Sequence, residues 1–568
     1  MLPEIRRRAL AVPPGFGVGL HPVLRRAYAA RGLTTDADLD LSLSRLLPVG
    51  SLAGVEAAAE LLAAHRRSGR VLVVGDFDAD GATSSALVVR ALRALGFAHV
   101  DFLVPNRFRF GYGLTPEIVV LAAGRSPTLI VTVDNGVSSI EGVEAARSHG
   151  IPVLITDHHL PGSALPHAAV IVNPNLPGAT FASPHLAGVG VAFYVVAALA
   201  RSLRDARFRA ADYLDLVALG TVADVVALDH NNRILVSQGL ARIRAGQCAP
   251  GIRALLEQAG RRCERATAAD LGFAVAPRLN AAGRLTDMSL GIECLLTDDA
   301  GQAVRLAAEL SRLNAERREI EQRMQDEAID ITAHLPRDAD GAAALGICLF
   351  DANWHQGVVG LVAGRIKERL HRPVIAFALA EDGSLRGSAR SIPGVHVRDA
   401  LDSVAVRHPG LIQKFGGHAM AAGLSLARDD FDAFRTAFGA EIARRADPDM
   451  LTGVLLSDGA LERADLCLET AQALGGGGPW GQGFPEPVFD GEFAVDGLRI
   501  VGEKHLRLRL RGAGGESAEA IAFGYVGGIH ETSELRPGRS VRVAFRLEVN
   551  EYNGTRRPQL NCLQLRPA

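Results

Sequence analysis

The chain has 568 residues, with 61 Lys and Arg against 63 Asp and Glu, and a formal net charge of −2. A hydrophobic fraction of 48% and a charged fraction of 22% exclude a largely disordered chain, and the length predicts roughly three or four domains. The near-neutral charge excludes only those nucleic-acid partners that a global positive field would hold.

Targeting signals are not evident. The longest apolar run, Leu186–Ala200, is shorter than the roughly 20 residues that a helix needs to cross a bilayer. No apolar stretch follows the basic residues near the N-terminus, so we expect no secretory signal. Six cysteines are scattered without a CxxC pair, which argues against a disulfide framework or a zinc knuckle. We therefore expect a cytoplasmic protein without a membrane partner.

The first half of the chain predicts a helical extension and then a parallel sheet. Residues 1 to about 67 are expected to be helical. Short apolar strands then alternate with amphipathic helices, which is typical of a parallel α/β sheet. The strand segments are VLVVG, HVDFLVP, TLIVTV, VLIT and AAVIVNP. Residues 186–297 are expected to be mainly helical.

The second half predicts a connecting helix, a second α/β unit and a small barrel. A charge-rich helical pattern runs from Ala300 to His334, with no Gly or Pro after Gly301. Strands and a helix follow to about residue 448. The segment GGGGPWGQGFPEP has the composition of a linker. About five alternating strands come next, two of them flanking the hairpin signal Asn553-Gly554, and they favour an oligonucleotide-binding (OB) type of barrel.

Acidic and histidine residues gather where the predicted strands end. Because ligands of parallel sheets bind beyond the carboxyl ends of the strands, these side chains should meet at one rim. Together they suit two Mn²⁺ or Mg²⁺ ions, the arrangement used for in-line phosphoryl displacement. A single Asp in such a place is often only a helix N-cap, so capping is the alternative for each. The residues are Asp76, Asp78, Asp80, Asp134, Asp157, His158, His159 and Asp224.

Four segments resemble, in order, the motifs of the DHH phosphoesterase superfamily: GDFDADGAT, TVDNG, TDHH and GTVADVV. Further segments are similar to the RecJ branch, which comprises bacterial single-strand-specific DNA exonucleases: PNRFRFGYGL, PRLNAAGRL, GSARS and KFGGHAMAAGL. The resemblance implies a DHH catalytic domain with a helical extension (1–300), a connecting helix (301–335), a DHH-associated α/β domain (336–450) and an OB-fold-like barrel (451–568).

The resemblance also implies roles within the rim. The metal ligands would be Asp78, Asp80, Asp134, His158 and Asp224, with Asp134 between the two ions. Asp76 and Asp157 would lie behind the ligands and orient them. His159 would contact the scissile phosphate or assist the leaving group, or would merely pack beside the site. Some relatives have a His where this chain has Val74, so one ion would need water or substrate phosphate to complete its ligands.

The implied activity is 5′→3′ hydrolysis of single-stranded DNA during repair and recombination. A single-strand-binding protein and a repair helicase are implied partners, and we expect a monomer. The alternative is a DHH-family oligonucleotidase or nucleotide phosphatase, but such relatives usually lack the long N-terminal extension and the barrel. A non-catalytic DNA-binding scaffold is disfavoured because all the motif residues are present.

Other residues are candidates for holding the strand. Arg109 and Tyr112 lie in a Gly-containing loop after a predicted strand, where Arg can contact phosphate and Tyr can stack a base. Arg278, Asn280 and Arg284 could bind backbone phosphates, or could serve as helix caps and surface. A pocket for the 5′-phosphate would combine backbone N–H groups, hydroxyls, a guanidinium and an imidazole from Ser388, Arg390, Ser391, Gly416, Gly417 and His418.

Overall fold

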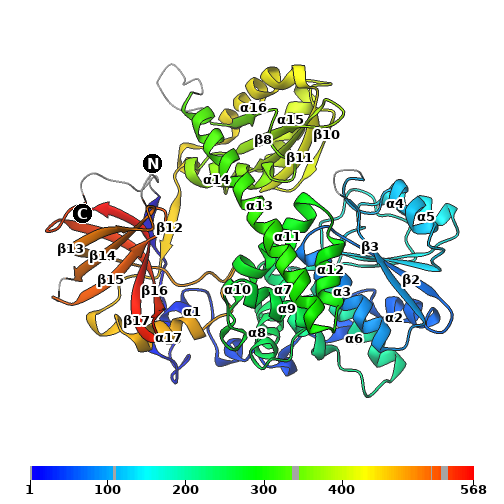
Figure 1. Ribbon diagram of the computed structural model, residues 1–568, viewed down its shortest axis with the longest axis horizontal. Coiled ribbons are helices and arrows are strands. Elements are labelled where there is room, and N and C mark those ends of the chain that lie inside the picture. Colours follow the sequence, from blue (N-terminus) through cyan, green and yellow to red (C-terminus); the bar gives the residue numbers. More distant parts are fainter. Residues whose placement is uncertain (1–2, 107–109, 335–344, 513, 526–534) are drawn as a thin grey trace.

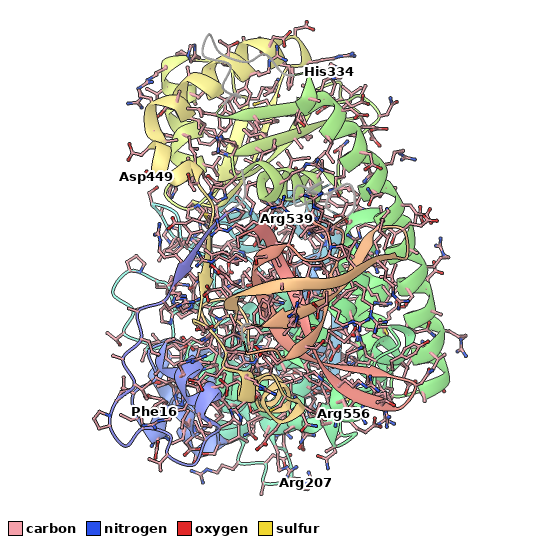
Figure 2. The ribbon with its side chains drawn as sticks, turned by 90° about the vertical axis from the view of Figure 1, so that its left-hand side faces the viewer. Phe16, Arg207, His334, Asp449, Arg539 and Arg556 are labelled. Atoms are coloured by element: carbon pink, nitrogen blue, oxygen red, sulfur yellow. The ribbon has the colours of Figure 1, made fainter. Side chains whose placement is uncertain are left out.

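The computed structural model describes residues 3–106, 110–334, 345–512, 514–525 and 535–568. The long helix α13 (Ala300–Ala333) runs from the parallel-sheet part to a smaller α/β part (Figure 1). The barrel lies on the side of the molecule opposite to the parallel sheet. Figure 2 looks from the barrel side and places His334, at the end of α13, in the smaller α/β part. The α/β fold with a terminal barrel is confirmed.

The first sheet is fully parallel, as predicted, in the order β3-β2-β4-β5-β6. Val73 and Val131 face a core with α3 and with α6 (Gly188–Leu203), whereas Val74 and Ile130 face a second core with α4 and α5. Burial on both faces explains the nearly continuous apolar strands. The elements are β2 (Arg70–Gly75), β3 (His99–Leu103), β4 (Leu129–Val133), β5 (Val153–Thr156), β6 (Val170–Val172), α2 (Val55–Ala64), α3 (Ala79–Ala94), α4 (Pro116–Ala123) and α5 (Ile140–Ser148).

A helical array follows the sheet and supports the rim from one side. The array consists of α6 (Gly188–Leu203), α7 (Leu214–Ala223), α8 (His230–Arg244), α9 (Pro250–Gln258), α10 (Ala268–Asp270), a π-helical turn (Leu271–Val275), α11 (Ala276–Leu285) and α12 (Ser289–Leu296).

Within the described residues no single helix is long and apolar enough to cross a membrane. One pair of helical segments, Leu43–Ser51 and Val55–Ala64, is long and apolar enough only when the two are taken together, and the pair is bent.

The second sheet is mixed, in the order β10-β11-β9-β8-β7, and only β7 and β8 pair in parallel. Its antiparallel strands place Gly387 opposite Leu424 and Ser388 opposite Gly423. The elements are β7 (Ile347–Phe350), β8 (Val374–Leu379), β9 (Leu385–Arg390), β10 (Lys414–Gly417), β11 (Ala421–Leu426), α14 (Val359–Leu370), α15 (Val397–Arg407) and α16 (Phe431–Arg445).

The expectation of helices through the first 67 residues is wrong in part. Strand β1 (Glu4–Arg7) pairs in parallel with β12 (Val454–Ser457), a contact between segments about 450 residues apart that local pattern could not reveal. Helix α1 (Pro22–Ala29) is short, and three 3-10 turns lie between it and α2. These turns, with the later ones, are Asp36–Leu39, Leu43–Arg45, Val49–Ser51, Ala210–Tyr213, Cys263–Arg265, Arg428–Asp430, Pro448–Leu451 and Arg463–Asp465.

The C-terminal strands close into the barrel β13-β14-β15-β17-β16. In β14, Leu506, Leu508 and Leu510 point inward and the arginines between them point outward, which confirms the predicted alternation. Two of these outward arginines form ion pairs, Arg507 with Glu519 and Arg511 with Asp496. The elements are α17 (Leu468–Gly476), β13 (Phe489–Val501), β14 (His505–Gly512), β15 (Ser517–Ala522), β16 (Ser540–Tyr552) and β17 (Thr555–Pro567).

Candidate metal centre and strand-binding site

Three strand ends and the end of α7 bring their polar side chains to one place. Asp134 follows β4, His158 follows β5, and Asp224 is the C-cap of α7. The Nε2 of His158 lies 3.1 Å from the Oδ1 of Asp134 and 3.5 Å from the Oδ2 of Asp224. Among the described residues, neither Asp134 Oδ1 nor His158 Nε2 has a hydrogen-bond partner, although both atoms are buried. Burying polar atoms without partners costs free energy, and a cation bound by both atoms would remove that cost.

The possible ligand atoms form overlapping groups, within each of which they lie no more than 4.8 Å apart. Asp134 and His158 each belong to two groups, and of these two side chains only the carboxylate has two oxygens with which to contact two ions. The resemblance places Asp76 behind the ligands, yet it falls in a group with Asp78 and Asp134 and is therefore a candidate ligand too. The donors are carboxylate and imidazole, which fit two Mn²⁺ or Mg²⁺ ions. The groups are Asp134, His158, His159; Asp80, His158, Asp224; and Asp76, Asp78, Asp134.

Asp157 has the surroundings of an orienting residue. Its Oδ1 accepts from the backbone N–H groups of His158 and His159 at 2.7 and 3.1 Å, and its Oδ2 accepts from Val137 N–H at 2.8 Å. The Oδ1 also lies 2.8 Å from the Nδ1 of His159. Burial alone would lower the pKa of His159, but this hydrogen bond and the charge of Asp157 outweigh it and raise the pKa to about 9. In the metal-free protein these surroundings favour the charged form of His159 at neutral pH.

The aspartates after β2 combine helix capping with membership of the site. Asp78 is the N-cap of α3, and its Oδ1 accepts from the N–H groups of Asp80 and Gly81, both at 3.0 Å. Capping, the alternative considered from the sequence, is thus present without removing Asp78 from the metal-ligand group. Asp80 instead accepts from Gly188 and Val189 N–H at the start of α6, a contact that sequence reasoning missed. The glycines near the start of this apolar helix were the available signal.

Mutual repulsion and burial govern the pKa values of the site. Burial and the charge of Asp78 raise the pKa of Asp80 to about 7. Burial and the charge of Asp80 hold the pKa of both Asp134 and Asp224 well above the usual carboxyl range. Burial and the charge of His159 lower the pKa of His158 to about 4, so its imidazole is neutral and able to bind a metal ion. Crowded carboxyls beside a neutral imidazole favour a divalent cation.

Asp224→Asn should raise the stability of the metal-free protein more at pH 8 than at pH 5. The pKa of Asp224 is raised in the folded state, so the unfolded chain loses its proton first and the free energy of unfolding falls as pH rises from about 4. The amide removes this penalty. Melting temperatures in excess chelator, for wild type and variant at both pH values, check this. An equal gain at the two pH values would contradict it.

Of the two loop residues predicted to bind the strand, Arg109 and Tyr112, the structure describes Tyr112. Tyr112 is half exposed, and its hydroxyl lies 3.2 Å from the Nδ1 of His159 and 3.3 Å from the backbone oxygen of Asp134. Its ring also meets Phe77 edge to face. Tyr112 therefore borders the site, where it can contact substrate. Arg109 lies outside the described residues.

The predicted phosphate contacts of the PRLNAAGR segment have other partners. Arg278 donates to the Ser311 hydroxyl at 3.0 Å and to the Ala274 carbonyl at 2.6 Å. Asn280 Oδ1 accepts from Ala79 N–H at 2.8 Å, which braces the loop after β2. The contacts of Arg278 favour the structural alternative for that residue. The bond of Asn280 uses only its amide oxygen, whereas a phosphate would accept from its amide nitrogen, so the phosphate contact of Asn280 stays a prediction. Arg284 donates to the Gly357 carbonyl at 3.1 Å and so ties α11 to the smaller α/β part.

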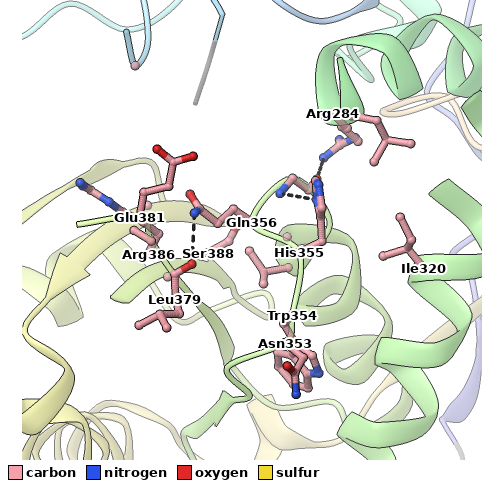
Figure 3. Close-up of a pocket in the computed structure, with 18 of the residues that line it drawn as sticks. Arg284, Ile320, Asn353, Trp354, His355, Gln356, Leu379, Glu381, Arg386 and Ser388 are labelled. Atoms are coloured by element: carbon pink, nitrogen blue, oxygen red, sulfur yellow. Dashed lines mark hydrogen bonds between the residues drawn. The ribbon is translucent and has the colours of Figure 1, made fainter. Parts of the chain in front are cut away.

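A cavity of about 1110 Å³ lies between the helical array, which contributes Arg284, and the smaller α/β part. Figure 3 shows Arg284 reaching toward His355 from one side, with Gln356, Ser388 and Glu381 across the opening. Arg390 also lines it and donates to the Ser388 hydroxyl at 3.0 Å. The predicted phosphate-binding strand thus borders a cavity that reaches the parallel-sheet part and its helical array.

The other residues predicted to bind the 5′-phosphate have different surroundings. Ser391 is buried and donates to the Val395 carbonyl at 2.6 Å, so its hydroxyl stabilises a turn. Gly416 and Gly417 end β10, and Gly417 has a φ of 140° that favours glycine. His418 stacks on His159, with ring centroids 6.4 Å apart. His418 therefore brings the smaller α/β part directly to the metal site.

Family models match three segments of the chain. The DHH family N-terminal domain matches residues 70–221, the DHHA1 domain residues 342–444, and the RecJ OB domain residues 457–564. The chain is 52% identical over 568 residues to the single-stranded-DNA-specific exonuclease RecJ of Escherichia coli, covering 98% of each chain. It is 36% identical to the RecJ of Thermus thermophilus, covering all of this chain and 79% of that one.

Solved structures agree with this relationship. A crystal structure of RecJ in complex with Mn²⁺ from Thermus thermophilus matches with a TM-score of 0.80 and 34% identity, over 97% of this chain and 76% of the other. The corresponding complex with Mg²⁺ matches with a TM-score of 0.75 and 32% identity, over 97% and 75%. By its sequence, its three domain matches and its fold, the chain belongs to the RecJ family.

Proposed function

We propose that this chain is a metal-dependent exonuclease that hydrolyses single-stranded DNA in the 5′→3′ direction during repair and recombination. The observation that carries the proposal is the pair of buried atoms without hydrogen bonds, Asp134 Oδ1 and His158 Nε2, among crowded carboxylates of the described residues. This arrangement is a site for divalent cations in a chain that is 52% identical to a single-stranded-DNA-specific exonuclease.

Bound Mn²⁺ or Mg²⁺ would supply activated water and neutralise charge at the phosphorus during in-line displacement of the 3′ oxygen. Asp78, Asp80, Asp134, His158 and Asp224 would hold the ions, with Asp76 as a further candidate. Asp157 fixes the ring of His159 and favours its charged form. His159 can therefore donate a hydrogen bond to the scissile phosphate or assist the leaving oxygen.

Polarity would follow from capture of the 5′-phosphate by Ser388 and Arg390. Both line the cavity beside the catalytic part, and the stacking of His418 on His159 joins this region to the metal site. A strand held there by its end would present an internal phosphodiester to the ions. The gap spanned by α13 would admit one strand and exclude a duplex.

Several finer features belong to the same proposal: the domain boundaries at residues 300, 335 and 450, a monomeric state, a cytoplasmic location, and cooperation with a single-strand-binding protein and a helicase. The closed barrel and its match to the RecJ OB domain speak against the alternative, an oligonucleotidase or nucleotide phosphatase. Such an enzyme would not need an added surface for a long strand.

A single strand with a 5′-phosphate and a label on its 5′ nucleotide should release labelled mononucleotides from the first seconds when Mn²⁺ is present. Excess chelator should stop release. The same strand labelled at its 3′ end should shorten progressively, and a blunt duplex should resist. Early release of the 3′ label would contradict the polarity, and equal digestion of the duplex would contradict threading. Gel analysis of timed samples distinguishes these results.

A further inference from the structure

Helix α6 begins directly against a predicted metal ligand. The carboxylate of Asp80 accepts from Gly188 N–H at 2.6 Å through Oδ2 and from Val189 N–H at 3.0 Å through Oδ1. These N–H groups belong to the first turn of α6, where intrahelical partners are missing, and the N-cap, Ala187, offers no side-chain bond. Asp80 is 1% exposed and lies 108 residues away in sequence. Both of its oxygens are thus fixed by backbone.

The same turn also touches the next ligand. A Cβ on Gly188 would lie 2.6 Å from the Cβ of Asp134 and 2.7 Å from its Oδ1. Only a residue without a side chain lets α6 approach this closely. Asp134 itself has a φ of 61°, an uncommon conformation that its surroundings must hold. One helical turn therefore limits the freedom of two carboxylates, one on α3 and one directly after β4.

Gly220, on α7, makes a similar approach from the other side of Asp80. A Cβ there would lie 2.7 Å from Asp80 Oδ1 and 2.2 Å from the Thr83 hydroxyl oxygen. Asp80 is consequently enclosed by α6 and α7, with little room for its carboxylate to turn. A carboxylate that accepts one N–H bond on each oxygen keeps a lone pair on each for a metal ion.

We propose that Gly188 and Val189 are positioning residues, whose backbone N–H groups, together with the missing side chain of Gly188, set the ligand geometry of Asp80 and Asp134. This rests on the proposed metal site. The first turn of α6 would hold these ligands in place before a metal ion arrives. Removing a partner that orients a ligand typically weakens metal binding about 10- to 100-fold.

Two substitutions test this, with Mn²⁺ affinity measured by calorimetric titration of the full chain. Gly188→Ala adds the methyl group that displaces Asp134. Val189→Pro deletes the N–H that Asp80 accepts, and proline is tolerated in the first turn of a helix. Each should weaken Mn²⁺ binding at least about tenfold while the circular dichroism spectrum stays that of the wild type.

Gly190→Ala is the matched control, because it adds the same methyl group to the same helix. The three atoms nearest to that methyl group would all belong to the side chain of Leu186, with its Cδ2 closest at 3.0 Å, and none to Asp80 or Asp134. Wild-type Mn²⁺ affinity in folded Val189→Pro and Gly188→Ala would overturn the proposal, as would equal weakening in Gly190→Ala. If Gly188→Ala does not fold, Val189→Pro decides. Asp134→Asn separates a failure of the proposed metal site from a failure of the positioning role. If this variant binds Mn²⁺ with wild-type affinity, the metal site itself is wrong.

Discussion

Asp134→Asn should reduce exonuclease activity by about a thousandfold or more and abolish tight Mn²⁺ binding, without unfolding the protein. Asp134 is 1% exposed, belongs to two of the candidate ligand groups, and has an oxygen without a hydrogen bond among the described residues. An amide keeps the shape but loses the charge that a divalent ion needs. Losing about 4 kcal/mol of transition-state stabilisation corresponds to about a thousandfold in rate.

The metal-free variant should at the same time be more stable than the metal-free wild type at neutral pH. Burial and the neighbouring carboxylates, first of all Asp80, raise the pKa of Asp134, so its ionised form destabilises the folded state. Lost activity with gained stability is a combination that a merely structural residue would not give. Melting temperature and initial rate of nucleotide release, measured on the same preparation, test both effects.

Asp215→Asn is the control for that substitution. Asp215 is also buried in the catalytic part, where it accepts from Ala249 N–H at 2.7 Å, and it belongs to none of the candidate metal groups among the described residues. The amide oxygen can still accept this bond, so activity should remain within about twofold of wild type. A comparable loss in both variants would show that any buried charge change inactivates the protein, and it would remove the case for Asp134 as a ligand.

The rim could be predicted from the sequence because each of its residues can be recognised from its immediate neighbours in the chain. Asp76, Asp134 and Asp157 each come directly after an apolar strand, and parallel strands bring their carboxyl ends to one edge. A contact such as that of Asp80 with α6 depends instead on how two distant elements pack. Gly188 and Gly190 near the start of this apolar helix indicate a close approach by another segment, but they do not show which residue approaches.

The same distinction explains where prediction and structure differ. A helical pattern covers the first residues, but Glu4–Arg7 extends because β12 offers a parallel partner. Asn280 was predicted to contact phosphate, and the packing of α11 gives its amide oxygen a partner, Ala79 N–H, that the sequence did not indicate. Side-chain chemistry limits what a residue can bind, whereas the packing of neighbouring elements decides which partner it meets. The barrel could be predicted because apolar and polar residues alternate in each of several consecutive strands.

Arg390→Ala should selectively weaken the use of strands with a 5′-phosphate, by roughly ten- to a hundredfold in kcat/KM. A guanidinium contributes about 1.5–3 kcal/mol through charge-assisted hydrogen bonds to an anion. Arg390 donates to Ser388 and lies on a strand that borders the cavity shared with the catalytic part. Strands ending in a 5′-hydroxyl lack the anion, so they should lose much less. Competition between the two kinds of end in one reaction measures the ratio directly.

Arg444→Ala removes the same charge from the same α/β part and serves as the control. Arg444 lies on α16 and pairs with Glu441, away from the residues that line the cavity. It should leave the preference for phosphorylated ends unchanged. If Arg390→Ala slows both kinds of end equally, the arginine supports the fold or the general path of the strand. A selective loss would instead place the 5′-phosphate at Arg390 and make the distance from there to the metal site the determinant of where the first cut falls.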